Sequence, residues 1–164
     1  MNCLDHIVVA ADNLQQGVDY LQATLGIEIP AGGRHSSMAT HNLVMQLGND
    51  AYIEVIAIDP DARAPRHPRW FSLDSADMRA AIREQPRLIT WVMNTPDLQS
   101  LAGQAGFDIG KPTSLSRDKL SWEFALPDDG RRVGKSTTSR MDVAPVTSMT
   151  RRSMPMPSPP VGGS

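Results

Sequence analysis

Two residues with metal-binding and proton-transfer chemistry interrupt apolar stretches of this sequence. His6 lies within the run from Leu4 to Ala11, and Glu54 lies within the run from Ala51 to Ile58. Both runs are typical of buried strands, where an imidazole or a carboxylate costs free energy unless it has a partner. A neutral imidazole and a carboxylate are suitable ligands for a divalent metal such as Zn, Ni, Mn or Fe. The pair therefore predicts a metal site if the fold brings the two side chains together.

Each of these residues also has a purely structural interpretation. Taken alone, His6 fits a core or edge histidine whose ring nitrogens are satisfied by neighbouring groups. Glu54 could form a salt bridge to an arginine instead of binding a metal. Two protein ligands by themselves make a weak metal site, because three or four are usual. Both interpretations stay open on the sequence alone.

Polar residues in and after the glycine-containing segment AGGRHSSMAT, residues 31–40, add candidates for ligand binding. His35 lies in this segment and His41 directly follows it, so either could complete a site or contact an anionic ligand. Arg34 could pair with a substrate carboxylate, although an arginine in a loop is more often solvated. His41 begins a strand and shares a face with apolar residues of that strand, so we expect it to point toward a specific partner.

The elements predicted around these residues form two similar sets. In the first set, a strand is followed by a helix that Asp12 or Asn13 can cap and Gly26 ends, and then by three strands. The second set starts again with a strand and a helix, and this helix ends at Gly106. The segment LGIEI at the end of the first helix matches AGFDI at the end of the second, which indicates an internal repeat. The predicted strands are 4–11, 27–29, 41–47, 51–58, 88–94 and one around 122–126. The second helix is capped by Asp74 or Ser75, and the third by Thr95.

The second set lacks a counterpart of the strand 51–58. From Arg132 to Ser164 the chain contains no Leu, Ile, Glu or aromatic residue and is rich in Ser, Thr, Pro, Met and Arg. Such a composition buries too little apolar surface to offset the entropy of ordering, so we predict that residues 132–164 are a disordered tail. The abrupt change also fits translation out of an ancestral reading frame, or a basic tail that binds something acidic.

Length, charge and cysteine content limit the class of protein. The chain has 164 residues, enough for one domain with its own core. Its net charge of -2 gives no reason to expect nucleic acid as a partner. No apolar run approaches the roughly 20 residues that span a membrane, no signal-peptide pattern opens the chain, and Cys3 is the only cysteine. We therefore predict a cytoplasmic protein with no membrane partner.

The sequence resembles the vicinal oxygen chelate superfamily, which includes glyoxalases, bleomycin resistance proteins and dioxygenases. The segments LDHIVVAADNL and AYIEVIAIDP, at the start and the end of the first set, carry the resemblance. More narrowly, the chain looks like the glyoxalase-like domain proteins over residues 3–131. The resemblance implies an α+β fold in which two βαβββ modules, 1–60 and 87–131, form a half-open barrel-like sheet. Residues 61–86, with one helix, would connect the modules, and the second module would lack its last strand.

The resemblance also implies roles for individual residues. In that superfamily the first and last strands of each module supply metal ligands, which places the ligands of the first module at His6 and Glu54. Glu54 would also act as the base that moves a proton next to a carbonyl. In the second module Thr90 aligns with His6 and no carboxylate aligns with Glu54, so this module departs from the pattern. Substrate contacts are predicted for Arg34, His35, His41, Trp91 and Trp122.

These expectations define a predicted function and its alternatives. We predict a glyoxalase-like protein with a small-molecule pocket and metal-dependent lyase, isomerase or dioxygenase chemistry. One alternative is a non-catalytic protein of the same fold that binds a small molecule such as a drug, and another is an inactive truncated product. Without a last strand, the strand around 122–126 would keep an unpaired edge, which a homodimer could cover.

Overall fold

An eight-stranded mixed sheet organises the chain in the computed structural model, which describes residues 2–48, 51–104, 108–117, 120–131 and 146–151. The strand order across the sheet is β2-β3-β4-β1-β5-β8-β7-β6. In chain order the elements are β1 (Cys3–Ala10), α1 (Leu14–Leu25), β2 (Ala31–His35), β3 (Thr40–Gln46), β4 (Tyr52–Ile58), the short 3-10 helix η1 (Trp70–Ser72), α2 (Ala76–Glu84), β5 (Arg87–Asn94), α3 (Leu98–Gln104), β6 (Lys111–Arg117), β7 (Leu120–Leu126) and β8 (Val146–Arg151).

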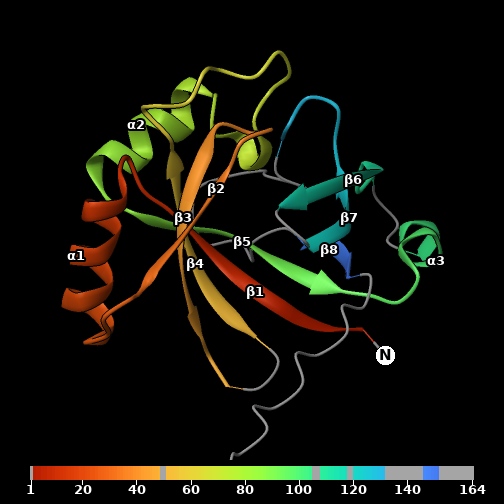
Figure 1. Ribbon diagram of the computed structural model, residues 1–164, viewed down its shortest axis with the longest axis horizontal. Helices are drawn as coiled ribbons and strands as arrows, with labels where there is room; N and C mark the ends of the chain where they lie inside the picture. The colour runs from red at the N-terminus through yellow and green to blue at the C-terminus, as the bar shows by residue number, and fades with distance from the viewer. Residues whose placement is uncertain (1, 49–50, 105–107, 118–119, 132–145, 152–164) are drawn as a thin grey trace, which may run out of the picture.

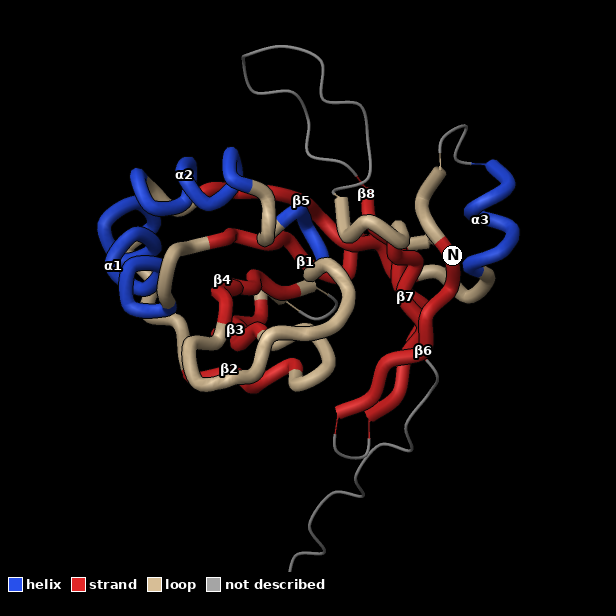
Figure 2. Tube along the Cα trace, turned by 90° about the horizontal axis from the view of Figure 1, so that it is seen from above, coloured by secondary structure: helices blue, strands red, loops and turns tan. Residues whose placement is uncertain are grey.

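The two halves of the sheet meet at the antiparallel pair β1 and β5. β1 runs parallel to β4 on one side of this pair, and β5 runs parallel to β8 on the other side. All other neighbouring strands are antiparallel. Each half therefore repeats one strand order outward from the centre, β1-β4-β3-β2 and β5-β8-β7-β6 (Figure 1). Seen from above, α1 and α2 lie beside the first half and α3 lies beside the second (Figure 2).

Helix α1 covers one face of the first half of the sheet. The Asn13 side chain accepts a hydrogen bond from the backbone N–H of Gln16, and Gly26 ends the helix in the left-handed conformation with φ of 66°, as the sequence predicted. Apolar side chains of α1 pack on a cluster that includes Val9, Ile53 and Val55. We call the face of the first half that these residues line the helix face.

The opposite face of β1 and β4 carries the larger core, and we call it the inner face. One end of this face is covered by the connection between the two halves, because η1 and α2 pack onto β1 and β4. Ser75 caps α2 by accepting a hydrogen bond from the backbone N–H of Met78, one of the two caps that the sequence offered. The residues of this cluster include Val8, Ala10, Ile56, Trp70, Phe71, Leu73, Met78, Ile82 and Phe124.

The α+β class predicted from the sequence is confirmed, and two local predictions are wrong. Residues 27–29 form no strand, because the chain first passes Pro30 and then pairs with β3 from Ala31 onward. Thr95 does not cap α3; the Asp97 side chain accepts the hydrogen bond from the backbone N–H of Ser100 instead. No helix among the described residues is long and apolar enough to cross a membrane.

The predicted absence of a last strand in the second half is also wrong. β8 lies between β5 and β7 and pairs with both. Its sequence VTSMTR contains β-branched residues, and two open strand edges satisfy its backbone groups without requiring much apolar surface. β7 is therefore not an edge strand, so the reason for expecting a homodimer no longer holds. The other residues of the predicted disordered tail, 132–145 and 152–164, lie outside the described residues.

Gly17→Ala should destabilise the protein by about 1–3 kcal/mol, because the added methyl group would overlap Val55 where α1 crosses β4. Urea unfolding followed by circular dichroism measures this change. Gly103→Ala in α3 is the matched control, since nothing lies within 4 Å of a Cβ atom at that position. Alanine is the better helix former by about 1 kcal/mol, so this control should be as stable as the parent or more stable. Equal losses in both variants would contradict the packing described for α1.

Candidate functional site

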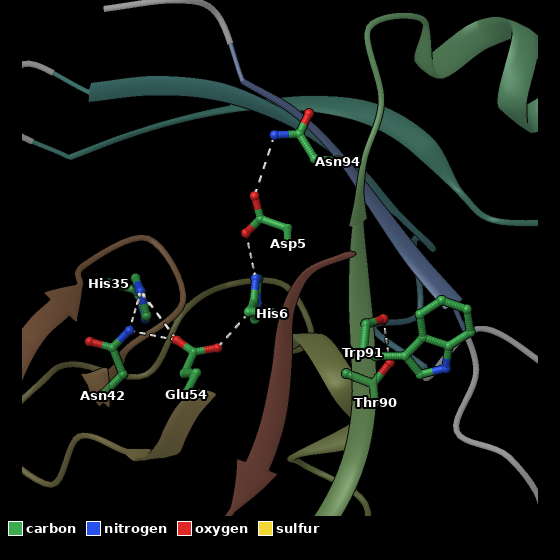
Figure 3. A network of polar contacts seen from close by, with 8 residues as sticks. All are labelled: Asp5, His6, His35, Asn42, Glu54, Thr90, Trp91 and Asn94. Atoms are coloured by element: carbon green, nitrogen blue, oxygen red, sulfur yellow. Dashed lines mark hydrogen bonds and ion pairs between the residues drawn. The ribbon is translucent and has the colours of Figure 1, made fainter. Parts of the chain in front are cut away.

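His6 and Glu54 are neighbours on the inner face because β1 and β4 are adjacent parallel strands. In the register of this pair His6 is opposite Tyr52 and Val8 is opposite Glu54, which places both polar side chains on one face of the sheet. His6 Nε2 is 3.5 Å from Glu54 Oε2, as Figure 3 shows. Each residue is only 5% exposed, and the His6 ring stacks on Tyr52 with 4.5 Å between centroids. The structure thus brings together the two residues that the sequence singled out.

Asp5 fixes the orientation of the His6 ring. Asp5 Oδ1 is 2.7 Å from His6 Nδ1, and Asn94 of β5 donates from Nδ2 to Asp5 Oδ2 over 3.5 Å. A carboxylate accepts hydrogen bonds, so His6 Nδ1 carries a proton, and Nε2 is the ring nitrogen that faces Glu54. Carboxylates orient metal-binding histidines in this way in many proteins.

Asn42 belongs to the site although no sequence motif pointed to it. Its Nδ2 donates to Glu54 Oε1 over 2.5 Å, and its Oδ1 accepts a hydrogen bond of 2.8 Å from the backbone N–H of Gly33. Asn42 is 5% exposed. The signal in the sequence was a polar amide within the predicted strand 41–47. Its proximity to Glu54 follows from the register of the sheet, in which Val44, two residues from Asn42, lies opposite Glu54.

His35 approaches the same carboxylate from β2. Its Nε2 is 4.0 Å from Glu54 Oε1 and 3.4 Å from Asn42 Nδ2. Its Nδ1 is 3.1 Å from Thr40 Oγ1, and its ring meets Trp70 edge-on with 4.9 Å between centroids. The indole N–H of Trp70, a residue that sequence reasoning did not find, is buried and has no hydrogen-bond partner among the described residues. His35 therefore belongs to the site through its contacts with Glu54 and Asn42, and Trp70 packs against its ring.

His41 does not reach this site. It is opposite Ala57 in the β3–β4 pair, so its side chain points to the helix face, away from Asn42 and Glu54. Burial is the largest influence on the pKa of His41 and lowers it below its usual 6.5, against the opposing effect of Asp59. The sequence correctly grouped His41 with the apolar residues of its strand, but that face is the one turned away from the site.

Arg34 is engaged by two carboxylates at the edge of the sheet. Its Nη1 is 3.1 Å from Asp59 Oδ2 and its Nη2 is 3.1 Å from Asp61 Oδ2. Asp59 is 2% exposed, and a buried carboxylate is costly without a cationic partner. In this structure Arg34 balances that buried charge, and its predicted contact with a substrate stays a prediction.

Of the two tryptophans predicted to contact a substrate, Trp91 lies away from the His6–Glu54 pair. Trp91 is opposite Ile7 across the β1–β5 pair, so it lies on the other face from His6, and Figure 3 shows its ring pointing away from the His6–Glu54 pair. Trp122 lies in β7, where its backbone pairs with β6, and its side chain is outside the described part of the structure.

Threonines occupy the second-half positions that correspond to the histidine and the glutamate. Thr90 is opposite Val8 across the β1–β5 pair, and His6 is opposite Val92 in the same pair. Thr90 is thus the counterpart of His6, as the sequence alignment predicted, and its buried hydroxyl donates to the carbonyl of the next residue over 3.3 Å. The pairing of β5 with β8 likewise puts Thr147 at the counterpart of the glutamate position.

The His6–Glu54 pair can supply two ligands to one divalent ion. Bonds from zinc to nitrogen or oxygen are about 2.0–2.2 Å long, so two ligands of a tetrahedral ion lie about 3.4 Å apart. The observed separation of Nε2 and Oε2 is 3.5 Å. No group of three or more His, Cys, Asp or Glu side chains in the described part of the chain is placed to hold a metal. The described residues therefore fit a metal as a pair of ligands and not as the set of four that the resemblance implies.

This fold, with a paired histidine and glutamate on its inner face, is that of the vicinal oxygen chelate superfamily. The chain belongs to the Glyoxalase-like domain family, which matches residues 4–146. The match extends beyond residue 131 to the start of β8, where the sequence had predicted only a tail. The comparison with curated proteins gave no significant match.

Solved structures with the same fold have little sequence in common with this chain. Methylmalonyl-CoA epimerase from Mycobacterium tuberculosis is 14% identical with a TM-score of 0.53, over 92% of this chain and 88% of that one. A hypothetical protein from Bacillus halodurans C-125 is 12% identical with a TM-score of 0.58, over 95% and 99%. A hypothetical protein from Staphylococcus aureus is 14% identical with a TM-score of 0.58, over 94% and 60%. At these identities the similarity shows the fold alone.

His41→Gln should reduce the loss of stability below pH 6.5. Because the pKa of His41 is lowered by burial, the unfolded chain binds the proton more readily than the folded one, and stability falls as the pH drops through 6.5. Without this histidine the melting temperature should decrease less between pH 7.5 and pH 5.5, as differential scanning calorimetry would measure. His67→Gln, at an exposed position, is the control and should keep the pH dependence of the parent. A His41→Gln profile that matches the parent would show that His41 protonates equally well in both states.

Proposed function

We propose that this chain is a metal-dependent isomerase or lyase acting on a small carbonyl compound. His6 and Glu54 would bind the metal on the inner face of a half-open barrel formed by two βαβββ modules. The observation that carries this proposal is the unbalanced contact between the two residues. Asp5 accepts a hydrogen bond from Nδ1, so in the neutral imidazole two electron-rich atoms, Nε2 and Oε2, would face each other inside the protein.

Two such atoms need a positive charge or a proton between them, and the distance favours a metal ion. A strong hydrogen bond from oxygen or nitrogen has a donor–acceptor distance of roughly 2.5–3.2 Å. The 3.5 Å between His6 Nε2 and Glu54 Oε2 is longer, and it agrees with the separation of about 3.4 Å between two ligands of a tetrahedral ion. Asp5, which orients the histidine, supports the same assignment.

The proposed chemistry is the transfer of a proton next to a carbonyl group. A divalent ion supplies Lewis acidity that polarises the carbonyl oxygen. The Glu54 carboxylate, held in place at Oε1 by Asn42, would accept and return the proton. The burial of Glu54 and His6 keeps water away from the reacting atoms. The methylmalonyl-CoA epimerases that share the fold are compatible with this reaction class, since an epimerase inverts a carbon centre.

A second candidate is a protein of the same fold that binds a small molecule without converting it. This alternative is favoured by the second half of the sheet, where threonines replace the histidine and the carboxylate of the first half. Such a protein would bind its ligand equally well with and without metal. A binding measurement on chelator-treated protein separates the two candidates.

Metal affinity should fall in a graded manner in His6→Ala and Asp5→Asn. Isothermal titration with Mn²⁺ or Zn²⁺ should give about one ion per parent chain, because one histidine–carboxylate pair defines one site. His6→Ala removes a ligand and should abolish this binding. Asp5→Asn weakens only the support of that ligand and should reduce affinity about 10- to 100-fold. His67→Gln is the surface control. A parent protein that binds neither ion in the millimolar range would reject the metal-dependent proposal and leave the binding protein.

In metal-free protein, Glu54→Gln should raise the free energy of unfolding by about 1–3 kcal/mol, since it replaces a buried repulsive contact by a hydrogen bond. The glutamine amide can donate to His6 Nε2, while its oxygen still accepts from Asn42. Urea unfolding in the presence of EDTA measures the change, with Glu28→Gln at an exposed position as the matched control. A clear loss of stability would mean that His6 carries two protons and bridges Asp5 and Glu54 as a cation, which would contradict the proposed lone pair.

A further inference from the structure

We infer that Asn42 is the positioning residue that keeps Glu54 turned toward His6 by holding it away from His35. The inference rests on the proposed role of the His6–Glu54 pair and assigns a function to a residue outside that pair. Glu54 has two histidines within reach, the buried His6 and the partly buried His35, and only His6 is part of the proposed metal site. Its Oε2 is 3.5 Å from His6 Nε2, and its Oε1 is 4.0 Å from His35 Nε2.

The amide of Asn42 contacts both Glu54 and His35. Its Nδ2 donates one hydrogen bond to Glu54 Oε1 over 2.5 Å and lies 3.4 Å from His35 Nε2 (Figure 3). An asparagine amide has two N–H donors, so one group can serve both neighbours at once. With this donor in place, Oε1 is satisfied and Oε2 is the oxygen left to face His6.

The glycines of β2 decide which end of the Asn42 amide faces Glu54. The backbone N–H of Gly33 donates to Asn42 Oδ1 over 2.8 Å, which turns the NH₂ end toward the carboxylate. A Cβ atom at residue 32 would overlap the carbonyl oxygen of Asn42 and lie 2.6 Å from its Oδ1. The register of β2 against β3 shifts between Ala31 and Arg34, and glycine at such a shift permits close approach of two backbones. The Gly-Gly segment is therefore shaped around this one side chain.

His35 is fixed in place, so Glu54 is the group that would move if Asn42 were removed. Thr40 Oγ1 is 3.1 Å from His35 Nδ1, and Trp70 packs edge-on against the ring. A buried Oε1 without a donor is costly, and His35 Nε2 lies 4.0 Å from it. This nitrogen can donate to Oε1 when the ring carries a proton on Nε2 and Nδ1 accepts from the Thr40 hydroxyl. A turn of the carboxylate toward His35 would withdraw Oε2 from His6 and disassemble the pair of metal ligands.

The test is a double-mutant cycle of Asn42→Ala and His35→Gln, with Mn²⁺ affinity measured by isothermal titration. Asn42→Ala should weaken Mn²⁺ binding about 10- to 100-fold, the usual effect of losing a group that orients a ligand. Adding His35→Gln removes the competing imidazole and should recover most of that loss, which gives a clear coupling between the two positions. If Asn42 had a purely structural role, the double variant would bind Mn²⁺ as weakly as Asn42→Ala does. That result overturns the inference, and so does an Asn42→Ala variant with the Mn²⁺ affinity of the parent.

A second test of the role of Asn42 uses a crystal structure and requires neither bound metal nor an activity assay. Crystals of metal-free Asn42→Ala should show Glu54 Oε1 within about 3.2 Å of His35 Nε2, with Oε2 withdrawn from His6. A Glu54 that keeps its parent position in this variant overturns the inference. If the parent binds no Mn²⁺, the metal proposal fails while this structural comparison still decides the role of Asn42. Asn42→Ser, whose hydroxyl can still accept from Gly33, serves in both experiments if Asn42→Ala does not fold.

Discussion

The parallel pairing of β1 with β4 is the constraint on which the rest of the structure depends. Its register puts Val8 opposite Glu54 and so makes His6 and Glu54 neighbours. A slip by one residue would turn one strand's polar side chain onto the helix face, where α1 packs. Close contact between Gly17 and Val55 opposes such a slip, because it locks α1 onto β4. Packing on one face of the sheet thereby secures the chemistry on the other.

Hydrogen bonds run along the site from both ends toward its centre. From one end, Asn94 donates to Asp5, which in turn receives the Nδ1 proton of His6. From the other end, Gly33 donates to Asn42, which donates to Glu54. Both chains end at the contact between His6 Nε2 and Glu54 Oε2, which joins them. Buried polar networks are costly when a single member lacks a partner, so this one contact decides the cost of the whole network.

Strand and helix periodicity predicted most of the first half of the fold and the central pair of the site. His6 and Glu54 could be found because each is a polar residue in an apolar strand, which is a local signal. Asn42 and His35 could not be ranked above His41 in the same way, because the choice between the two faces of β3 depends on where α1 packs. That packing is a tertiary property.

The last strand was missed for a different physical reason. Its apolar content is low, and composition measures how much surface a segment can bury on its own. β8 instead gains its partners from two neighbouring strands whose backbone groups are already aligned. A gap within a sheet can therefore order a segment that would not fold as an independent unit, and only the structure shows that gap.

The two halves of the sheet carry different residues at the positions that correspond to the site. A sheet built from two similar halves would present a ligand with two equivalent walls if both halves carried the same residues. Here one half carries His6 and Glu54, while the corresponding positions of the other half are Thr90 and Thr147. The two halves of the sheet therefore share one strand order but differ in chemistry at matching positions, with titratable residues in one half and neutral hydroxyl residues in the other.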